Sequence, residues 1–201
     1  MYKWLNESFF GMDQSIFRFV FEMIDNCPWL AKLARFISYF GDHGYFFIGM
    51  TILFLVFRKT RNMGLLLAIG LLVGEFINNI ILKNLVARPR PYDEVEEFYV
   101  MWKTFSNLKM NSYSFPSGHT CMAMMFGSGL FIMMNKKYSW LFLLVGPLMA
   151  WSRVALFVHY PSDVLFGMIF GAISITCAYF LLKVLLKWKF MNNLTKGDKL
   201  F

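Results

Sequence analysis

The sequence predicts an all-α integral membrane protein, a single domain over residues 1–201 built as a bundle of about six transmembrane helices. Composition is the first observation behind this prediction. Hydrophobic residues make up 58% of the chain and charged residues only 16%, and the mean hydropathy is +0.50. A water-soluble domain of this length could not bury so much apolar surface, so a bilayer is its expected solvent. One domain is the ordinary expectation for a chain of 201 residues.

The length of the apolar segments is the second observation. Four of them approach the ~20 residues that a helix needs to cross the hydrocarbon core: residues 62–82, 117–135, 138–158 and 164–182. A fifth, 44–57, is short and is expected to begin earlier. Residues 15–40 are apolar but broken by Asn26 and Pro28. They form either one kinked span or a surface-lying amphipathic helix that leads into a span. The first choice gives six spans and places the N-terminus inside.

Positive charges in the short connections predict the orientation, because cytoplasmic loops are enriched in Lys and Arg. Three clusters fall on one side of the membrane by the span count: Arg58, Lys59 and Arg61; Lys136 and Lys137; and Lys183, Lys187 and Lys189. The loop 83–115 and the turn 159–162 then lie on the outer face of the cell membrane. The formal charge of +8 could suggest nucleic acid as a partner, but its distribution over these connections argues against that. No protein partner is evident.

Several cations are not explained by orientation. Lys83, Arg88, Arg90 and Arg153 lie at or near the outer ends of spans, where an anionic ligand would account for them. Three pieces of sequence meet on that face: residues 83–91 (KNLVARPRP), 115–119 (FPSGH) and 152–163 (SRVALFVHYPSD). Together they supply cations, two histidines, a carboxylate and a Pro-Ser-Gly turn that opens a helix.

These residue types suit phosphoryl chemistry. Fixed cations stabilise the charge on a transferring phosphoryl group, and the planar fork of Arg can bind two of its oxygens. Ser117 is expected as the N-cap of a helix whose backbone N–H groups would bind phosphate. A neutral imidazole can attack phosphorus, and a second can protonate the leaving oxygen. Asp163, four residues after His159, is placed to accept the other ring N–H of that histidine.

The three pieces resemble the signature of the type 2 phosphatidic acid phosphatase superfamily, K-x6-R-P, P-S-G-H and S-R-x5-H-x3-D, with every spacing matched. The resemblance implies that His159 is the nucleophile that forms a phosphohistidine, that Asp163 orients it and that His119 is the general acid. It implies that the phosphate is held by Lys83, Arg90, Ser117, Gly118 and Arg153. It also implies a lipid phosphatase that needs no metal and no cofactor and whose substrate lies in the bilayer.

The substrate is left open among several lipids. Undecaprenyl diphosphate is favoured, with phosphatidylglycerophosphate or phosphatidic acid as alternatives. Transfer of the phosphate to a second lipid is a further alternative. A protein of another class, which only binds or transports lipid headgroups, has no need of a nucleophile and an acid.

Other chemistry is less well supported by the residues. Two histidines and Asp163 could bind zinc, but the cations nearby oppose a divalent ion. A haem between the histidines leaves those cations unexplained. Arg88 is a candidate accessory contact to the ligand, and His43 is expected in a surface turn.

Two further segments carry expectations. Glu75, Asn79 and Lys83 are spaced to share one helix face, where a structural pairing is favoured over a functional relay. Residues 93–102 are expected to form a short helix at the membrane interface, with Tyr99 and Trp102 at headgroup level, and could act as a lid.

Overall fold

The computed structural model describes residues 2–187, and these residues form helices without a strand among them. The α-helices are α1 (Tyr2–Asn26), α2 (Trp29–Tyr39), α3 (Tyr45–Val56), α4 (Arg61–Glu75), α5 (Lys83–Val86), α6 (Pro91–Glu94), α7 (Glu96–Phe105), α8 (Gly118–Met133), α9 (Lys136–Ser139), α10 (Val145–Ala155) and α11 (Pro161–Leu185). A π-helical stretch, Phe76–Leu82, joins α4 to α5, and a 3-10 stretch, Trp140–Leu144, joins α9 to α10. Lys189, one of the residues used above for orientation, lies outside the described residues.

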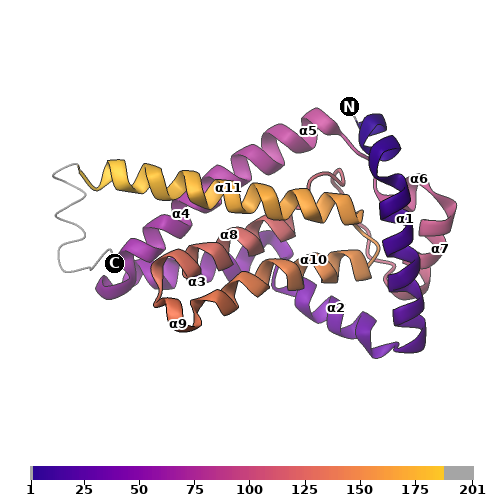
Figure 1. The fold of residues 1–201 in the computed structure, drawn as a ribbon, viewed down its shortest axis with the longest axis horizontal. Helices are drawn as coiled ribbons and strands as arrows, with labels where there is room; N and C mark the ends of the chain where they lie inside the picture. Colours follow the sequence, from indigo (N-terminus) through magenta and orange to yellow (C-terminus); the bar gives the residue numbers. More distant parts are fainter. Residues whose placement is uncertain (1, 188–201) are drawn as a thin grey trace.

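Within residues 2–187, three helical stretches are long and apolar enough to cross a membrane: Trp29–Val56, Arg58–Glu94 and Pro161–Leu185. Helix α8 is shorter and equally apolar, and it accounts for the predicted span 117–135. The predicted span 138–158 is built from α9, the 3-10 stretch and α10. Helices α3, α8, α10 and α11 run along the long axis of the molecule (Figure 1). The all-α membrane bundle is confirmed.

Helix α8 is the centre of the bundle and packs against α4, α10 and α11. Small residues let the backbones approach closely, as is common between helices in membranes. A Cβ atom at Gly167 of α11 would lie only 2.7 Å from the carbonyl oxygen of Ser117, and one at Gly70 of α4 would lie 2.8 Å from Ile175. This packing fixes where the N-terminus of α8 lies relative to α11.

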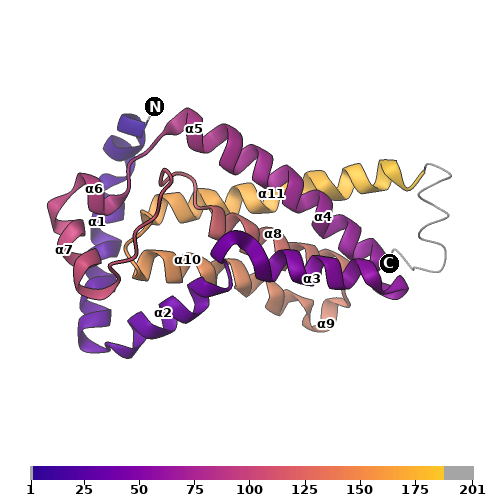
Figure 2. The same ribbon diagram turned by 180° about the vertical axis from the view of Figure 1, so that it is seen from behind.

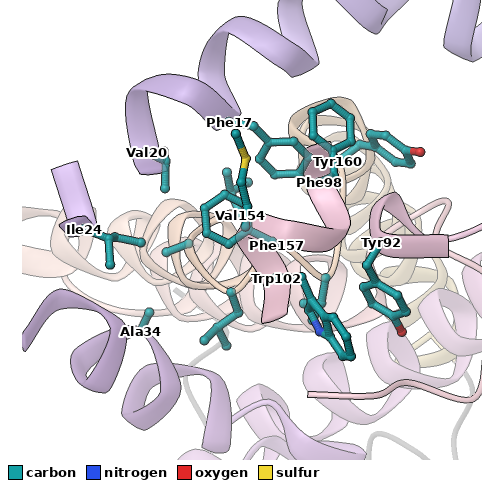
Figure 3. Packing of buried hydrophobic residues seen from close by; sticks show 14 of the residues in the cluster. Phe17, Val20, Ile24, Ala34, Tyr92, Phe98, Trp102, Val154, Phe157 and Tyr160 are labelled. Carbon is teal, nitrogen blue, oxygen red and sulfur yellow. The ribbon is translucent and has the colours of Figure 1, made fainter. Parts of the chain in front are cut away.

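Helix α1 crosses one end of the bundle instead of running along it, as both ribbon views show (Figures 1 and 2). It packs beside α6 and α7. Asn6 donates to Glu94, and Arg18 pairs with Glu97 at 2.7 Å. Its buried face carries Phe17 into an aromatic cluster with residues of α7 and of the α10–α11 connection (Figure 3).

This arrangement corrects the expectation for the N-terminal region. Residues 15–40 fall in two helices that meet at Pro28, and α1 lies on the same face as the loop 83–115. Placing the N-terminus on the opposite face is therefore wrong, and the count of six spans is not confirmed. Trp4, Met12, Ile16 and Phe19 are exposed on α1. The helix matches the alternative of an amphipathic helix that leads into a span.

The segment 93–102 falls in two short helices, α6 and α7, which are separated at Val95, and one aromatic residue points inward. Trp102 is only 3% exposed, stacks on Tyr92 with ring centroids 4.5 Å apart and donates its indole N–H to the Leu108 carbonyl. Trp102 therefore fastens the loop to the bundle, with its ring packed inside the protein.

Asp13 is the strongest tie of α1 to the bundle, and its loss should destabilise the fold. This buried carboxylate pairs with Arg88 at 3.0 Å and accepts from the Ser162 amide at 2.7 Å. Breaking a buried ion pair typically costs ~3–5 kcal/mol, because the partner charge stays buried. Asp13→Asn should lower the free energy of unfolding in detergent by roughly 3 kcal/mol. Asp25→Asn, an exposed change on the same helix, is the control, and equal effects of the two substitutions would contradict this role.

Candidate active site

The three motif pieces come together at the end of the bundle that α1, α6 and α7 cover. Backbone hydrogen bonds join them: the Ser114 amide donates to the Arg88 carbonyl at 2.8 Å, and the Ser117 amide donates to the Asp163 carbonyl at 3.1 Å. The first piece is thus held to the second, and the second to the third. The site depends on these contacts between segments that are far apart in the chain.

A cavity of ≈1360 Å³ opens at this junction. Five of the eight predicted site residues line it: Lys83, Arg90, Gly118, His119 and His159. The other three, Ser117, Arg153 and Asp163, are fully buried and are not among its lining residues. From the cations the cavity continues between α3 and α4, where apolar side chains line it: Ile48, Ile52, Leu55, Ala68, Leu71 and Leu72. One end of the cavity is therefore basic and the other suits an apolar chain.

His159 lies in the connection between α10 and α11. The chain reverses there through Phe157, whose φ of 54° is unusual for a bulky residue. The Nε2 atom of His159 is 3.0 Å from Nη1 of Arg90. Arginine can only donate, so Nε2 is the acceptor and the ring proton is on Nδ1. The lone pair of the neutral ring therefore points toward the cation that lines the cavity.

Asp163 is near His159, but the expected hydrogen bond is not formed. Its Oδ2 atom is 3.7 Å from Nδ1 of His159, beyond hydrogen-bond distance, and Nδ1 has no hydrogen-bond partner among residues 2–187. Asp163 instead accepts from the Tyr160 amide at 3.0 Å, from the Ser114 hydroxyl and from Arg88 at 2.6 Å. It thereby starts α11 and anchors the loop before α8.

Arg88 is not the accessory ligand contact that the sequence suggested, because it does not line the cavity. It is fully buried between Asp13 and Asp163, and its guanidinium carbon lies 3.7 Å from the centre of the Tyr160 ring. Sequence reasoning missed Asp13. The available signal was an acidic residue at a helical spacing with the apolar Phe17, Val20 and Ile24 of the same face.

His119, in the first turn of α8, has a partner that sequence reasoning also missed. Its Nε2 atom is 3.0 Å from Oδ1 of Asp42, in the turn between α2 and α3. Gly41 allows this approach, because a Cβ atom there would collide with the His119 ring. His43 follows in the same turn, is exposed as expected and also lines the cavity.

Ser117 is the N-cap of α8, as predicted, with extended backbone dihedrals. Its hydroxyl does not cap the helix but lies 3.0 Å from the Thr120 hydroxyl. The first-turn N–H groups are therefore not satisfied by this side chain, which leaves the helix end suited to an anion.

The remaining cations differ in exposure. Lys83 lines the cavity and donates to Asn79 at 3.1 Å, and Asn79 donates to Glu75 at 2.6 Å, so the expected pairing along this face is confirmed. Arg153 is buried, donates to the Ser38 hydroxyl and leaves its Nε without a hydrogen-bond partner in the described part of the chain. Within residues 2–187 no three His, Cys, Asp or Glu side chains gather as a metal site would require.

The structure is an all-helical membrane bundle with a basic cavity, and the PAP2 superfamily profile matches residues 61–188. The chain belongs to the PAP2 superfamily. It is 30% identical to the undecaprenyl-diphosphatase of Sulfolobus acidocaldarius over 144 residues, 71% of this chain and 66%, just under two thirds, of that protein. It is 33% identical to the decaprenylphosphoryl-5-phosphoribose phosphatase of Mycobacterium tuberculosis over 153 residues, 72% of this chain and 76% of that protein.

Solved structures show the same fold. The crystal structure of Aquifex aeolicus LpxE matches with a TM-score of 0.65 and 26% identity, over 80% of this chain and 92% of that chain. A PAP2-type phosphatidylglycerolphosphate phosphatase from Bacillus subtilis matches with a TM-score of 0.62 and 22% identity, over 88% of this chain and 89% of that one.

The geometry around His159 predicts how its ring titrates. Burial, and then the nearby Arg90 guanidinium, hold the pKa of His159 well below its ordinary range. Nitrogen NMR of labelled histidine in micelles should show the neutral Nδ1–H form persisting well below pH ~6.5, the ordinary value. The unfolded chain takes up this proton near that pH and the folded protein does not, so this ring makes the folded state less stable as the pH falls below it. A ring that protonates near its ordinary pKa would contradict the arrangement.

Proposed function

We propose that this protein is a metal-independent membrane lipid phosphatase that hydrolyses a lipid phosphate or diphosphate through a phosphohistidine at His159, with undecaprenyl diphosphate as the favoured substrate. The observation that carries the proposal is the cavity, in which His119, His159 and two cations lie at one end of an apolar groove between α3 and α4. A lipid bound there keeps its chain in the groove and its phosphate among the cations.

The reaction follows from the atoms at the basic end. When the Arg90 guanidinium turns from His159 to the substrate phosphate, the Nε2 lone pair of His159 is released and attacks phosphorus. The bond from phosphorus to the leaving oxygen breaks as His119 donates a proton to that oxygen. Water then attacks the phosphohistidine, the phosphorus–nitrogen bond breaks and the proton of the water returns to His119. Lys83, Arg90 and the N-terminus of α8 stabilise the phosphoryl oxygens in both steps.

Arg153 and Asp163 support this chemistry from behind the cavity wall. Arg153 places a buried positive charge beside it, with an Nε–H that has no protein partner in the described residues. Asp163 faces the Nδ1–H of His159 and stabilises the positive charge that develops on the ring. Since these cations and the helix N-terminus supply the positive charge, the proposed reaction needs no metal and no cofactor.

The choice of lipid rests on the relatives and the groove. The names of the archaeal and mycobacterial relatives refer to polyprenyl lipids. A polyprenyl chain is apolar along its length, like most of the groove. Glu75 and Asn79 are polar lining residues below Lys83. They favour phosphatidylglycerophosphate, whose headgroup bears a hydroxyl, as the second candidate.

The direct test is release of phosphate by the purified protein in detergent from a panel of lipid phosphates and diphosphates, with and without EDTA. We expect hydrolysis of undecaprenyl diphosphate that EDTA leaves intact. Activity that EDTA abolishes and zinc or magnesium restores would overturn the metal-independent mechanism. Binding of the lipids without release would favour a headgroup-binding protein, and phosphate recovered on a second lipid would favour a phosphotransferase.

The proposed acid can be tested by the leaving group. His119→Ala removes the proton donor, which is typically worth about 10²–10⁴-fold in rate. An alkyl phosphate leaves as an alkoxide and should suffer a loss in this range. A diphosphate leaves as a phosphate that needs less protonation and should be partly spared. Equal losses on both substrates, measured as kcat/KM, would contradict the role of His119.

The proposed side of the membrane is the outer face, because the cationic loops mark the opposite end of the bundle as cytoplasmic. Lys103 lies on α7 at the site end, and Lys137 lies on α9 at the other. With Cys27, Cys121 and Cys177 changed to Ser, a cysteine introduced at position 103 should react with an impermeant reagent in intact cells. One at position 137 should react only after the membrane is opened. The reverse pattern would favour a substrate in the cytoplasmic leaflet.

A further inference from the structure

A hydroxyl outside the three motifs lies between two of the proposed phosphate-binding cations. Ser112 is in the loop between α7 and α8, is exposed and lines the cavity. Its Oγ atom accepts from Nη2 of Arg90 at 3.1 Å and lies 3.5 Å from Nζ of Lys83. The loop thus brings a neutral polar side chain to the most basic part of the cavity.

Arg90 holds this residue at a defined position relative to the proposed nucleophile. Its Nε atom donates to the Ser112 carbonyl oxygen at 2.8 Å, while Nη1 lies 3.0 Å from Nε2 of His159. One planar guanidinium therefore contacts both Ser112 and His159. Because the guanidinium is planar and rigid, it sets the position of Ser112 relative to the attacking nitrogen before the substrate binds.

The hydrogen of the Ser112 hydroxyl remains available. A hydroxyl has one donor and two acceptor positions, and Lys and Arg have donors only. The oxygen of Ser112 must accept from both cations, so its own hydrogen cannot point at either of them. Ser112 lines the cavity, and a hydrogen directed into it would meet an anion placed against Lys83 and Arg90.

We propose that Ser112 is a further phosphate-binding residue, whose hydroxyl donates a hydrogen bond to a non-bridging oxygen of the substrate phosphate. The inference rests on the proposed function, because it takes the cavity as the phosphate site. A hydrogen bond to a charged oxygen is stronger than one between neutral groups, and the two cations that polarise this hydroxyl strengthen it as a donor.

The test compares Ser112→Ala, which removes the hydroxyl, with Ser112→Thr, which keeps it. Ala leaves the Ser112 carbonyl in place for Arg90, so the contact between Arg90 and His159 should survive. Thr104→Ala is the matched control, because it removes an exposed hydroxyl of α7 that bonds only within its helix. Two quantities are measured. One is kcat/KM for phosphate release, and the other is the orthovanadate concentration that gives half of the maximal increase in melting temperature.

A hydrogen bond to a charged group typically changes a rate or binding constant by about 10- to 100-fold, so Ser112→Ala should lower kcat/KM by that factor. The same variant should need about tenfold more orthovanadate for the same protection. Ser112→Thr should stay within about threefold of the wild type in both measurements. The melting temperature without ligand should be unchanged. Should Ser112→Ala fail to fold, Ser112→Cys, a much weaker donor, carries the same expected loss. The inference would be overturned if Ser112→Ala behaved like Thr104→Ala in both measurements. It would also be overturned if Ser112→Ala and Ser112→Thr lost equal amounts of activity and protection.

The two proposals can fail separately. If the wild type releases phosphate from no lipid, the proposed function fails, and protection by orthovanadate still tests Ser112. If the wild type hydrolyses lipids and Ser112→Ala matches it in both measurements, only the role of Ser112 fails.

Discussion

Arg88 carries a charge in a place where water cannot reach it, and much of the site depends on how that charge is paired. A buried cation is tolerated only with partners that satisfy its donors. Arg88 finds them on α1, at Asp13, and at the start of α11, at Asp163. The backbone of Arg88 also accepts from Ser114, in the loop before α8. A single residue therefore ties the N-terminal helix, the last helix and all three motif pieces together.

While Arg88 is held in its two ion pairs, the side chain of Arg90 nearby lines the cavity. Arg90, two residues after Arg88, points the other way and holds the lone pair of His159. Asp163 is shared, since one oxygen accepts from Arg88 and the other faces His159. The same carboxylate thus belongs to the scaffold and to the proposed catalytic site. The long Asp163–His159 distance is consistent with this sharing, because Arg88, Ser114 and the Tyr160 amide all compete for the carboxylate.

The division of the molecule into an apolar bundle and a polar end explains the cavity. The bundle needs small residues such as Gly167 for close helix packing, and the polar end needs partners for each buried charge. The cavity lies where the two regions meet. A lipid phosphate has the same division, an apolar chain and a charged end, and this match underlies the proposed substrate class.

The sequence alone predicted the parts that depend on local pattern. Apolar segments of spanning length gave the helical membrane bundle, and motif spacing gave the residues that line the cavity, such as Lys83 and His119. It did not predict the partners that arise from tertiary packing. Asp13 pairs with a residue 75 positions away, and Asp42 reaches His119 from another helix pair. No periodicity encodes such contacts, because they depend on where the chain turns.

The prediction for the N-terminal region was wrong for the same reason, because it depended on tertiary contacts. The sequence from residue 15 to 40 is apolar, and only the contacts of Asp13 and Arg18 with distant residues show that α1 crosses the end of the bundle. The role of Arg88 was misjudged because proximity to a motif says nothing about which way a side chain points. The arrangement of Arg90 over His159 likewise required the fold.

Whether His159 is the nucleophile can be decided by a rapid-quench experiment with a lipid substrate whose transferred phosphate is radiolabelled. We expect an acid-labile phosphoprotein that forms within the first turnover and carries its label on His159. The label and turnover should both be absent from His159→Ala. A label on another residue, or turnover retained by His159→Ala, would show that His159 is not the nucleophile.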